Sequence, residues 1–229
     1  MQEPALMLQD LRFTWPGRAS FGLSVPEFWI GQGQSVLLLG ESGSGKSTLL
    51  SLICGIVTAD RGRVEVGGCD LSTLGAGARD RFRAERIGVI FQQFNLLPYA
   101  SVADNIQLPL RFAPERRNRA APEEAAALCA ALGLPEGITG TTAGRLSVGQ
   151  QQRVAVARAL IGQPPLIVAD EPTSALDAAA QDSFLGLLFD QIAATGASLL
   201  MVSHDERLGA RFDRVLRLAD IASTERAVA

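Results

Sequence analysis

The sequence contains very little lysine, histidine and cysteine. Of its 21 basic residues only Lys46 is a lysine, and His204 is the only histidine. A coding bias toward arginine explains this scarcity but does not explain the positions of the two residues, since Lys46 lies in the segment GESGSGKST and His204 in the segment MVSHD. The three cysteines, Cys54, Cys69 and Cys129, show neither paired nor metal-ligand spacing, so we expect reduced thiols in a cytoplasmic protein.

Long apolar runs are also missing. No run approaches the roughly 20 residues that cross a bilayer, and the first residues show no basic stretch leading into an apolar one. We therefore expect neither a membrane span nor a secretory signal.

The 24 acidic residues outnumber the 21 basic ones, for a net charge of −3, which argues against a nucleic-acid-binding surface. With 47% hydrophobic residues, the chain of 229 residues buries a substantial core.

The hydrophobic pattern predicts alternating strands and helices. Short apolar or alternating segments predict strands at residues 6–13, 21–30, 35–39, 63–66, 86–91, 166–169 and 198–202. Helical spacing predicts helices at 46–57, 122–132, 150–160 and 178–195. Such alternation around buried strands is typical of a parallel α/β sheet. Between residues 92 and 149 prolines punctuate helical pieces without a strand signal, which indicates a helical insertion in a single cassette.

A glycine-rich loop follows the apolar segment 35–39. Residues 40–48 read GESGSGKST and fit the pattern G-x-x-x-x-G-K-[ST] between a strand and a helix. Glycines let backbone N–H groups turn toward phosphate oxygens, and the helix start adds its positive dipole end. Lys46 is expected to reach the β- and γ-phosphates, and the Ser47 hydroxyl to bind Mg²⁺. An ordinary glycine-rich turn is the alternative, which the strand–loop–helix context disfavours.

Two acidic residues follow the strand predicted at 166–169. Asp170 is placed to hold Mg²⁺ through its water shell, and Glu171 to polarise an attacking water. A solvated acidic turn is the ordinary explanation of such a pair. The phosphate loop favours the catalytic one, because ligands of open α/β sheets bind at the carboxyl ends of strands.

A second anion site is predicted at the start of the helix near residue 150. Residues 146–152 read LSVGQQQ before an apolar-periodic helix. A Ser, a Gly and a helix N-terminus together suit an anion, although Ser147 alone is better explained as an N-cap. A dimer in which each chain supplies one half-site explains why one small cassette has two such sites.

These motifs together resemble the nucleotide-binding subunit of an ATP-binding cassette (ABC) transporter. They are GESGSGKST, Phe91-Gln92-Gln93, LSVGQQQRVAVARAL, LIVADEPTSALD and MVSHD, in the family's order. More narrowly, FQQFNLLP, SVADNI and QQQRVAVARAL are similar to cassettes of the lipoprotein-releasing and macrolide-exporter type.

The resemblance implies a set of roles for residues of this chain. Glu171, His204, Gln92 and Lys46 would be catalytic, with Gln92 at the hinge into the helical lobe and His204 as a switch near the γ-phosphate. For His204 alone, a buried core histidine would be the default. Trp15 would stack on adenine, and Ser47, Gln92 and Asp170 would serve Mg²⁺. The remaining ATP-binding positions would be Gly40, Glu41, Ser42, Gly43, Ser44, Gly45, Thr48, Ser147, Gly149, Gln150 and Asp177.

The family architecture is also implied by the resemblance. It is a P-loop NTPase α/β fold with a mostly parallel sheet, an N-terminal antiparallel β subdomain and an inserted helical subdomain. Residues 1–92 and 150–229 would form the RecA-like core, and residues 93–149 the helical signature subdomain. The implied partners are a second copy of the chain, forming an ATP sandwich, and an integral membrane subunit that docks near residues 93–106. The chain would then lie at the cytoplasmic face of the inner membrane.

One position departs from the family pattern. The usual signature is LSGGQ, and Val148 replaces its first glycine. A β-branched residue is unsuited to positive φ, so either this backbone is not left-handed or the loop is strained. Gly149, the glycine that faces phosphate in the family, is retained, and we expect a working site.

The sequence leaves two other functions open. A soluble cassette ATPase acting in DNA repair or on the ribosome would carry long coiled coils or two cassettes, and this chain has neither. A regulatory cassette of the cell-division type is less easily separated, because intact Lys46, Glu171 and His204 allow hydrolysis without defining its output.

Overall fold

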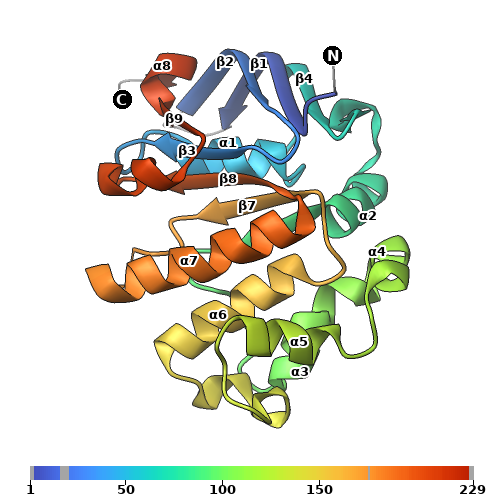
Figure 1. Cartoon of the computed structure of the whole chain (residues 1–229). Helices are drawn as coiled ribbons and strands as arrows, with labels where there is room; N and C mark the ends of the chain where they lie inside the picture. Colours follow the sequence, from blue (N-terminus) through green and yellow to red (C-terminus); the bar gives the residue numbers. More distant parts are fainter. Residues whose placement is uncertain (1–2, 16–20, 175, 227–229) are drawn as a thin grey trace. The chain divides into compact units, whose positions relative to one another are not determined.

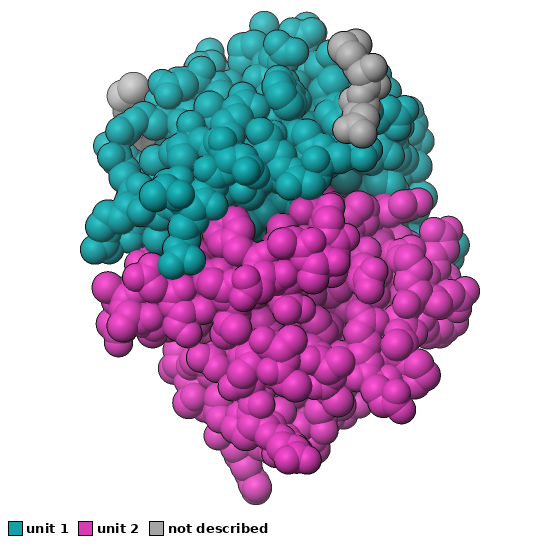
Figure 2. Space-filling model, in the orientation of Figure 1, with its two compact units in different colours: residues 1–83, 198–229 teal, residues 84–197 magenta. Residues whose placement is uncertain are grey.

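The computed structural model describes residues 3–15, 21–174 and 176–226. The chain divides into two compact units, residues 1–83 with 198–229 and residues 84–197 (Figure 2).

An antiparallel sheet forms the first part of unit 1 (Figure 1). Its strands are β1 (Leu6–Trp15), β2 (Phe21–Ile30), β4 (Arg61–Val66), β5 (Cys69–Asp70) and β10 (Ser223–Arg226), in the order β10-β2-β1-β4-β5. The alternation expected in β2 is observed, since Leu23, Val25 and Phe28 are buried. This sheet confirms the antiparallel β subdomain.

Parallel strands form the second part of unit 1. The fully buried β3 (Ser35–Leu39) pairs in parallel with β8 (Ser198–Ser203) and with β9 (Arg214–Arg217). A short continuous apolar strand is what a central parallel position requires, because both of its faces are covered. The helices α1 (Lys46–Ile53) and α8 (Leu218–Ile221) follow β3 and β9, while α2 (Ala76–Arg86) runs into unit 2.

Unit 2 combines a parallel strand pair with helices. β6 (Ile87–Ile90) pairs in parallel with β7 (Leu166–Asp170). Its helices are α3 (Val102–Gln107), α4 (Pro114–Arg119), α5 (Glu124–Ala131), α6 (Val148–Leu160) and α7 (Ala178–Thr195). Val102, Ile106, Leu128 and Val154 are buried among them. The parallel pairs in both units and the helices confirm the predicted α/β fold class.

Several predicted boundaries need correction. The helix expected over 46–57 ends at Ile53, because Gly55 takes a left-handed φ of 62° just after it. The helix expected at 122–132 spans only Glu124–Ala131, and the one expected at 150–160 begins two residues earlier at Val148. By contrast, the segments predicted at 35–39 and 178–195 are observed with the same bounds.

Candidate functional site

The phosphate loop joins β3 to α1 in unit 1. Gly43 and Gly45 have φ values of 75° and 106°, in the left-handed region that glycine tolerates best. A Cβ on Gly45 would stand 2.8 Å from Cζ of Phe21, so a side chain is excluded there on steric grounds as well. Gly45 is the N-cap of α1, and Lys46 is its first residue. The loop therefore turns its backbone in the way a phosphate cradle requires.

Two polar side chains of the loop are turned inward. Lys46 is 6% exposed, and its Nζ donates hydrogen bonds to the carbonyl oxygens of Gly40 and Glu41 at 2.6 and 2.9 Å. The Ser44 Oγ is buried and has no hydrogen-bond partner among the described residues. A buried hydroxyl without a partner costs free energy, and a phosphate oxygen would satisfy it. The residues present therefore fit a nucleotide phosphate.

The pairing of β3 with β8 brings His204 to the same edge. Leu39 is in register with Ser203, and the Gly40 amide donates to the Ser203 carbonyl oxygen at 3.2 Å. His204 is exposed, so it is not the buried core histidine that was the default alternative. A hollow of about 450 Å³ opens here, within unit 1, and is lined by His204 together with Leu39, Gly40, Glu41, Ser44, Glu206, Arg217, Leu218 and Ala219.

Trp15 ends β1 beside the start of α1. Its indole Nε1 donates a hydrogen bond to the Thr48 hydroxyl oxygen at 3.1 Å, and Phe13 contacts its ring edge to face with centroids 5.0 Å apart. Trp15 is 40% exposed. An aromatic side chain near the phosphate loop is therefore accessible to a ligand.

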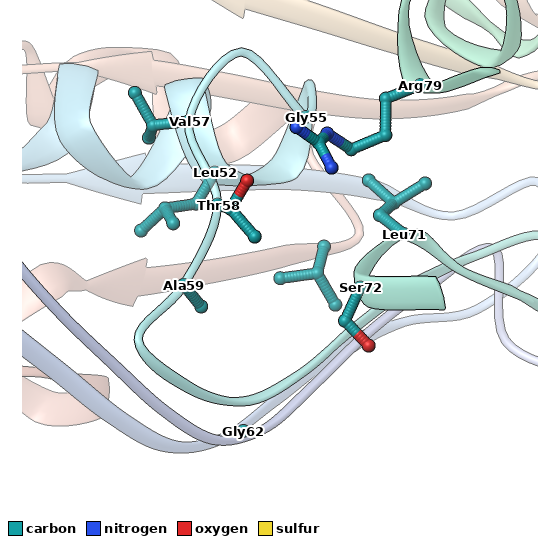
Figure 3. A pocket seen from close by; sticks show the side chains of 10 residues that line it. Leu52, Gly55, Val57, Thr58, Ala59, Gly62, Leu71, Ser72 and Arg79 are labelled. Carbon is teal, nitrogen blue, oxygen red and sulfur yellow. The ribbon is translucent and has the colours of Figure 1, made fainter. Parts of the chain in front are cut away.

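A second hollow in unit 1 is too small for a nucleotide. Figure 3 shows its lining side chains, among them Leu52, Leu71 and Arg79, which come from α1, a short 3-10 helix and α2. Its volume of about 10 Å³ suits about one water molecule. We therefore assign it no ligand.

The acidic pair and Gln92 lie at one edge of the strand pair in unit 2. Ile90 is in register with Ala169, so residues after β6 and β7 leave the pair on the same side. Asp170 ends β7 and is half-buried, and Glu171 follows with a left-handed φ of 42°. A non-glycine residue in this region is strained, and such strain is concentrated at functional sites. Gln92, two residues after β6, is exposed.

The signature residues form the start of α6. The Ser147 hydroxyl oxygen accepts a hydrogen bond from the Gln150 backbone N–H at 3.3 Å. The Gln150 side-chain carbonyl oxygen accepts one from the Ser147 backbone N–H at 3.0 Å. This capping box bears out the N-cap explanation of Ser147. Val148 is the first residue of the helix, so its backbone is right-handed and the replaced glycine leaves no strain. A Cβ on Gly149 would meet nothing within 4 Å, so the space beside it is open.

The two remaining predicted segments are also in unit 2. Asp177 is the N-cap of α7 and accepts a hydrogen bond from the Ala180 amide at 2.8 Å. In the segment 93–106, Tyr99 is 79% exposed, Leu96 is half-buried and Phe94 is buried. Phe94 therefore packs into the core while Tyr99 faces outward, so only part of the segment expected to dock a membrane subunit is exposed.

The predicted site residues fall into two sets. Unit 1 holds Trp15, the loop 40–48 and His204, while unit 2 holds Gln92, Ser147, Gly149, Gln150, Asp170, Glu171 and Asp177. No group of three or more His, Cys, Asp or Glu side chains within the described ranges is arranged to hold a metal ion. A Mg²⁺ that keeps most of its waters does not need such a cage.

Sequence reasoning missed two buried polar residues of α6. Gln152 donates to the Pro172 carbonyl oxygen, next to Glu171, and Arg158 donates to the carbonyl oxygens of Phe94 and Asn95, just after Gln92. The available signal was a polar residue at a helix position that the apolar pattern marks as buried.

Comparisons with known proteins agree with this geometry. A family model described as ABC transporter matches residues 23–174. The lipoprotein-releasing system ATP-binding protein LolD of Ruegeria sp. is 40% identical, over 99% of this chain and 100% of its own length. The macrolide export ATP-binding/permease protein MacB of Hyphomonas neptunium is 39% identical over 96% of this chain, which spans only 34% of that relative.

Solved structures show the same fold. A dimeric ATP-binding cassette in a post-hydrolysis state, bound to ADP and Pi, matches with a TM-score of 0.82 and 32% identity, over 98% of this chain and 99% of that one. The dimeric structure of a bacterial ABC transporter cassette matches with a TM-score of 0.80 and 31% identity, over 98% and 99% of the two chains.

Proposed function

Since this chain belongs to the ABC transporter family, we propose that it is the ATP-binding and ATP-hydrolysing subunit of a transporter of the lipoprotein-releasing or macrolide-export kind. The observation that carries this proposal is the phosphate loop itself. Its left-handed glycines, the inward Lys46 and the Ser44 hydroxyl, which no described residue satisfies, form a cradle, and strand register brings His204 beside it.

ATP binding in unit 1 follows from the contacts of the loop. The backbone amides of residues 40–48 and the N-terminus of α1 would receive the phosphates. Lys46 would exchange its bonds to the Gly40 and Glu41 carbonyl oxygens for the β- and γ-phosphates. Trp15, which is 40% exposed, would stack on the adenine.

Hydrolysis needs positioning and charge neutralisation more than covalent chemistry. Ser47, Gln92 and Asp170 are the residues that would hold Mg²⁺, which neutralises charge on the phosphates when it is bound. Glu171 would accept a proton from the attacking water, and His204 would contact the γ-phosphate. The strained backbone of Glu171 supports a role that depends on its orientation.

The second half of the site would come from a second copy of the chain. Ser147, Gly149 and Gln150 at the start of α6 would close on the γ-phosphate of the nucleotide bound by the partner, and Asp177 would communicate across the dimer. The open space beside Gly149 and the dimeric state of the similar cassettes support this arrangement.

The output of the cycle would be delivered to a membrane subunit. In the described part of the chain, no helix has the length and apolar character of a membrane span. We propose that residues 93–149 act as the helical signature subdomain, that 1–92 and 150–229 act as the RecA-like core, and that the membrane subunit docks near 93–106. The chain would then be held at the cytoplasmic face of the inner membrane, without a nucleic-acid partner.

Replacing Lys46 tests the ATPase proposal. Lys46→Ala removes the charge aimed at the phosphates, and loss of one such contact costs about 10²–10³ in rate. We expect phosphate release to fall to background while circular dichroism shows an intact fold. Near-normal turnover by this variant would contradict the phosphate-loop assignment.

A further inference from the structure

Helix α6 holds two buried polar side chains that the proposed reaction does not use directly. From Val154 onward every residue of the helix is buried, and Gln152 and Arg158 are only 2% and 7% exposed. A buried amide or guanidinium must be hydrogen-bonded, so their partners identify what each side chain holds. All of these partners are backbone carbonyl oxygens within unit 2.

Gln152 holds the segment that carries Glu171. Its Nε2 donates to the Pro172 carbonyl oxygen at 2.6 Å. Pro172 is itself buried and directly follows Glu171, whose φ is 42°. The donor therefore fixes the peptide between Pro172 and Thr173, one residue beyond the strained Glu171.

Arg158 holds the segment that follows Gln92. Its Nη1 donates to the Asn95 carbonyl oxygen at 2.7 Å, and its Nη2 donates to the Phe94 carbonyl oxygen. Phe94 and Asn95 have φ values of 57° and 47°, so two consecutive non-glycine residues are left-handed here. Burial lowers the pKa of Arg158 to about 10, which leaves the side chain charged at neutral pH. A charged donor shared by two carbonyls stabilises a turn that the backbone alone disfavours.

Close packing of α6 on β6 makes the second contact possible. A Cβ on Gly88 would stand 2.2 Å from the Ala159 carbonyl oxygen, so only glycine allows the helix to approach this closely. Arg158 directly precedes Ala159, and Gln92 lies two residues after the end of β6. The close approach therefore places the last turns of α6 beside the segment that follows β6.

Three of the five left-handed non-glycine residues in the described chain are thus Phe94, Asn95 and Glu171, each at or next to an α6 contact. We infer that Gln152 and Arg158 are positioning residues for ATP hydrolysis, which orient Glu171 and Gln92 through the neighbouring backbone carbonyls. This inference rests on the proposed roles of Glu171 and Gln92. Helix α6 would then orient both the Glu171 and the Gln92 side chain.

The first test compares arginines of the same helix. Arg153 also lies on α6 and donates to two carbonyl oxygens, those of Leu132 and Gly133, which are not part of the catalytic segments. Displacement of reacting groups by about 1 Å can cost about 10²-fold in rate, so we expect Arg158→Lys to lower kcat at least about tenfold. ATP affinity, measured with a fluorescent nucleotide, should be unchanged, and the Mg²⁺ concentration for half-maximal activity should rise. Arg153→Lys should change none of these, and equal losses in both variants would overturn the inference.

Double-variant cycles test whether each residue acts through its proposed target. If Arg158 acts through Gln92, then Arg158→Lys should cost little in a Gln92→Ala background. Gln152→Met, which keeps the volume but cannot donate, should likewise cost little in a Glu171→Ala background. Independent, multiplicative losses would overturn the inference. If both Gln92→Ala and Glu171→Ala keep normal ATPase activity, the proposed site itself is contradicted.

A glycine variant keeps the test decisive if Arg158→Lys is poorly folded. Glycine adopts positive φ without strain, so Asn95→Gly should restore part of the kcat of Arg158→Lys. A restored melting temperature without restored kcat would show that Arg158 only stabilises the fold.

Discussion

For Trp15, the structure adds contacts that the sequence does not indicate. In the sequence it is the aromatic residue of the segment LRFTWPG, and its adenine-binding role is implied by resemblance alone. In the structure its indole nitrogen bonds Thr48, a residue of the first turn of α1, and Phe13 packs against its ring. These two contacts hold an exposed ring beside the phosphate loop, where a base would stack on it.

We predict that Trp15→Ala weakens ATP binding about tenfold, since stacking of a base on an aromatic ring contributes about 1–3 kcal/mol. Trp15→Phe retains a stacking face and should bind ATP more tightly than Trp15→Ala. Isothermal titration with ATP measures both. Trp29, the other tryptophan, lies on β2 and stacks against the Arg214 guanidinium. Trp29→Ala is therefore the matched control and should leave the ATP affinity unchanged. Equal affinities of Trp15→Ala and the wild type would contradict the stacking role.

At the scale of elements, the position of β3 decides where the phosphate loop stands. The Asp213 carboxylate accepts hydrogen bonds from the Ser35 amide at 2.8 Å and from its hydroxyl at 2.7 Å, which ties the start of β9 to the start of β3. Both bonds lower the pKa of Asp213, and the bond from the Ser35 backbone amide has the larger effect. The carboxylate therefore contributes stability above the ordinary aspartate pKa of about 3.9 and loses it as pH falls through the lowered folded-state value.

We predict that Asp213→Asn lowers the melting temperature at pH 7 by roughly 1–3 °C, a modest effect because the carboxylate is exposed. The difference from the wild type should shrink and vanish as pH falls below the lowered pKa of Asp213. Thermal unfolding followed between pH 7 and 3 measures this. A constant difference between Asp213→Asn and the wild type at every pH would contradict the assignment.

At the scale of the whole molecule, ATP is expected to join two copies of the chain. Glu171→Gln keeps the shape of the side chain but cannot act as a base, so the ATP-bound dimer should accumulate. Gel filtration with ATP and Mg²⁺ should then show about twice the 24.2 kDa of the monomer. Adding Lys46→Ala should restore the monomer, because nucleotide binding is lost. A Glu171→Gln variant that stays monomeric at saturating ATP, even with its membrane partner present, would count against the sandwich.

The other expected partner is the membrane subunit. Tyr99 is 79% exposed, so Tyr99→Asp should not disturb the core. We predict that it weakens co-purification with the membrane subunit while the isolated chain keeps its ATPase rate. Phe112→Asp, at a comparably exposed aromatic outside the segment 93–106, is the matched control. Weaker assembly with Phe112→Asp alone would place the docking surface outside the segment 93–106. The absence of any membrane partner would favour the soluble cassette ATPase.

The sequence by itself determined the features whose signals are local. The glycine-rich loop between β3 and α1 and the helix Ala178–Thr195 were predicted correctly, because glycine spacing, an adjacent buried strand and helical periodicity lie within a few turns of chain. The weaker strands β9 and β10 were missed. β9 is only half-buried, and an exposed alternating segment resembles a loop until its pairing partner is known.

Only the tertiary structure decided how the local motifs are supported. The sequence marks Gln152 and Arg158 as polar residues of an apolar helix, but their acceptors lie 20 residues or more away, at Pro172, Phe94 and Asn95. The same holds for His204, which reaches the loop through the register of β3 with β8. Hydrogen-bond partners distant in the chain are selected by packing and strand pairing. Residue types and their spacing therefore determine the chemistry of this protein, whereas the fold determines which backbone holds that chemistry in place.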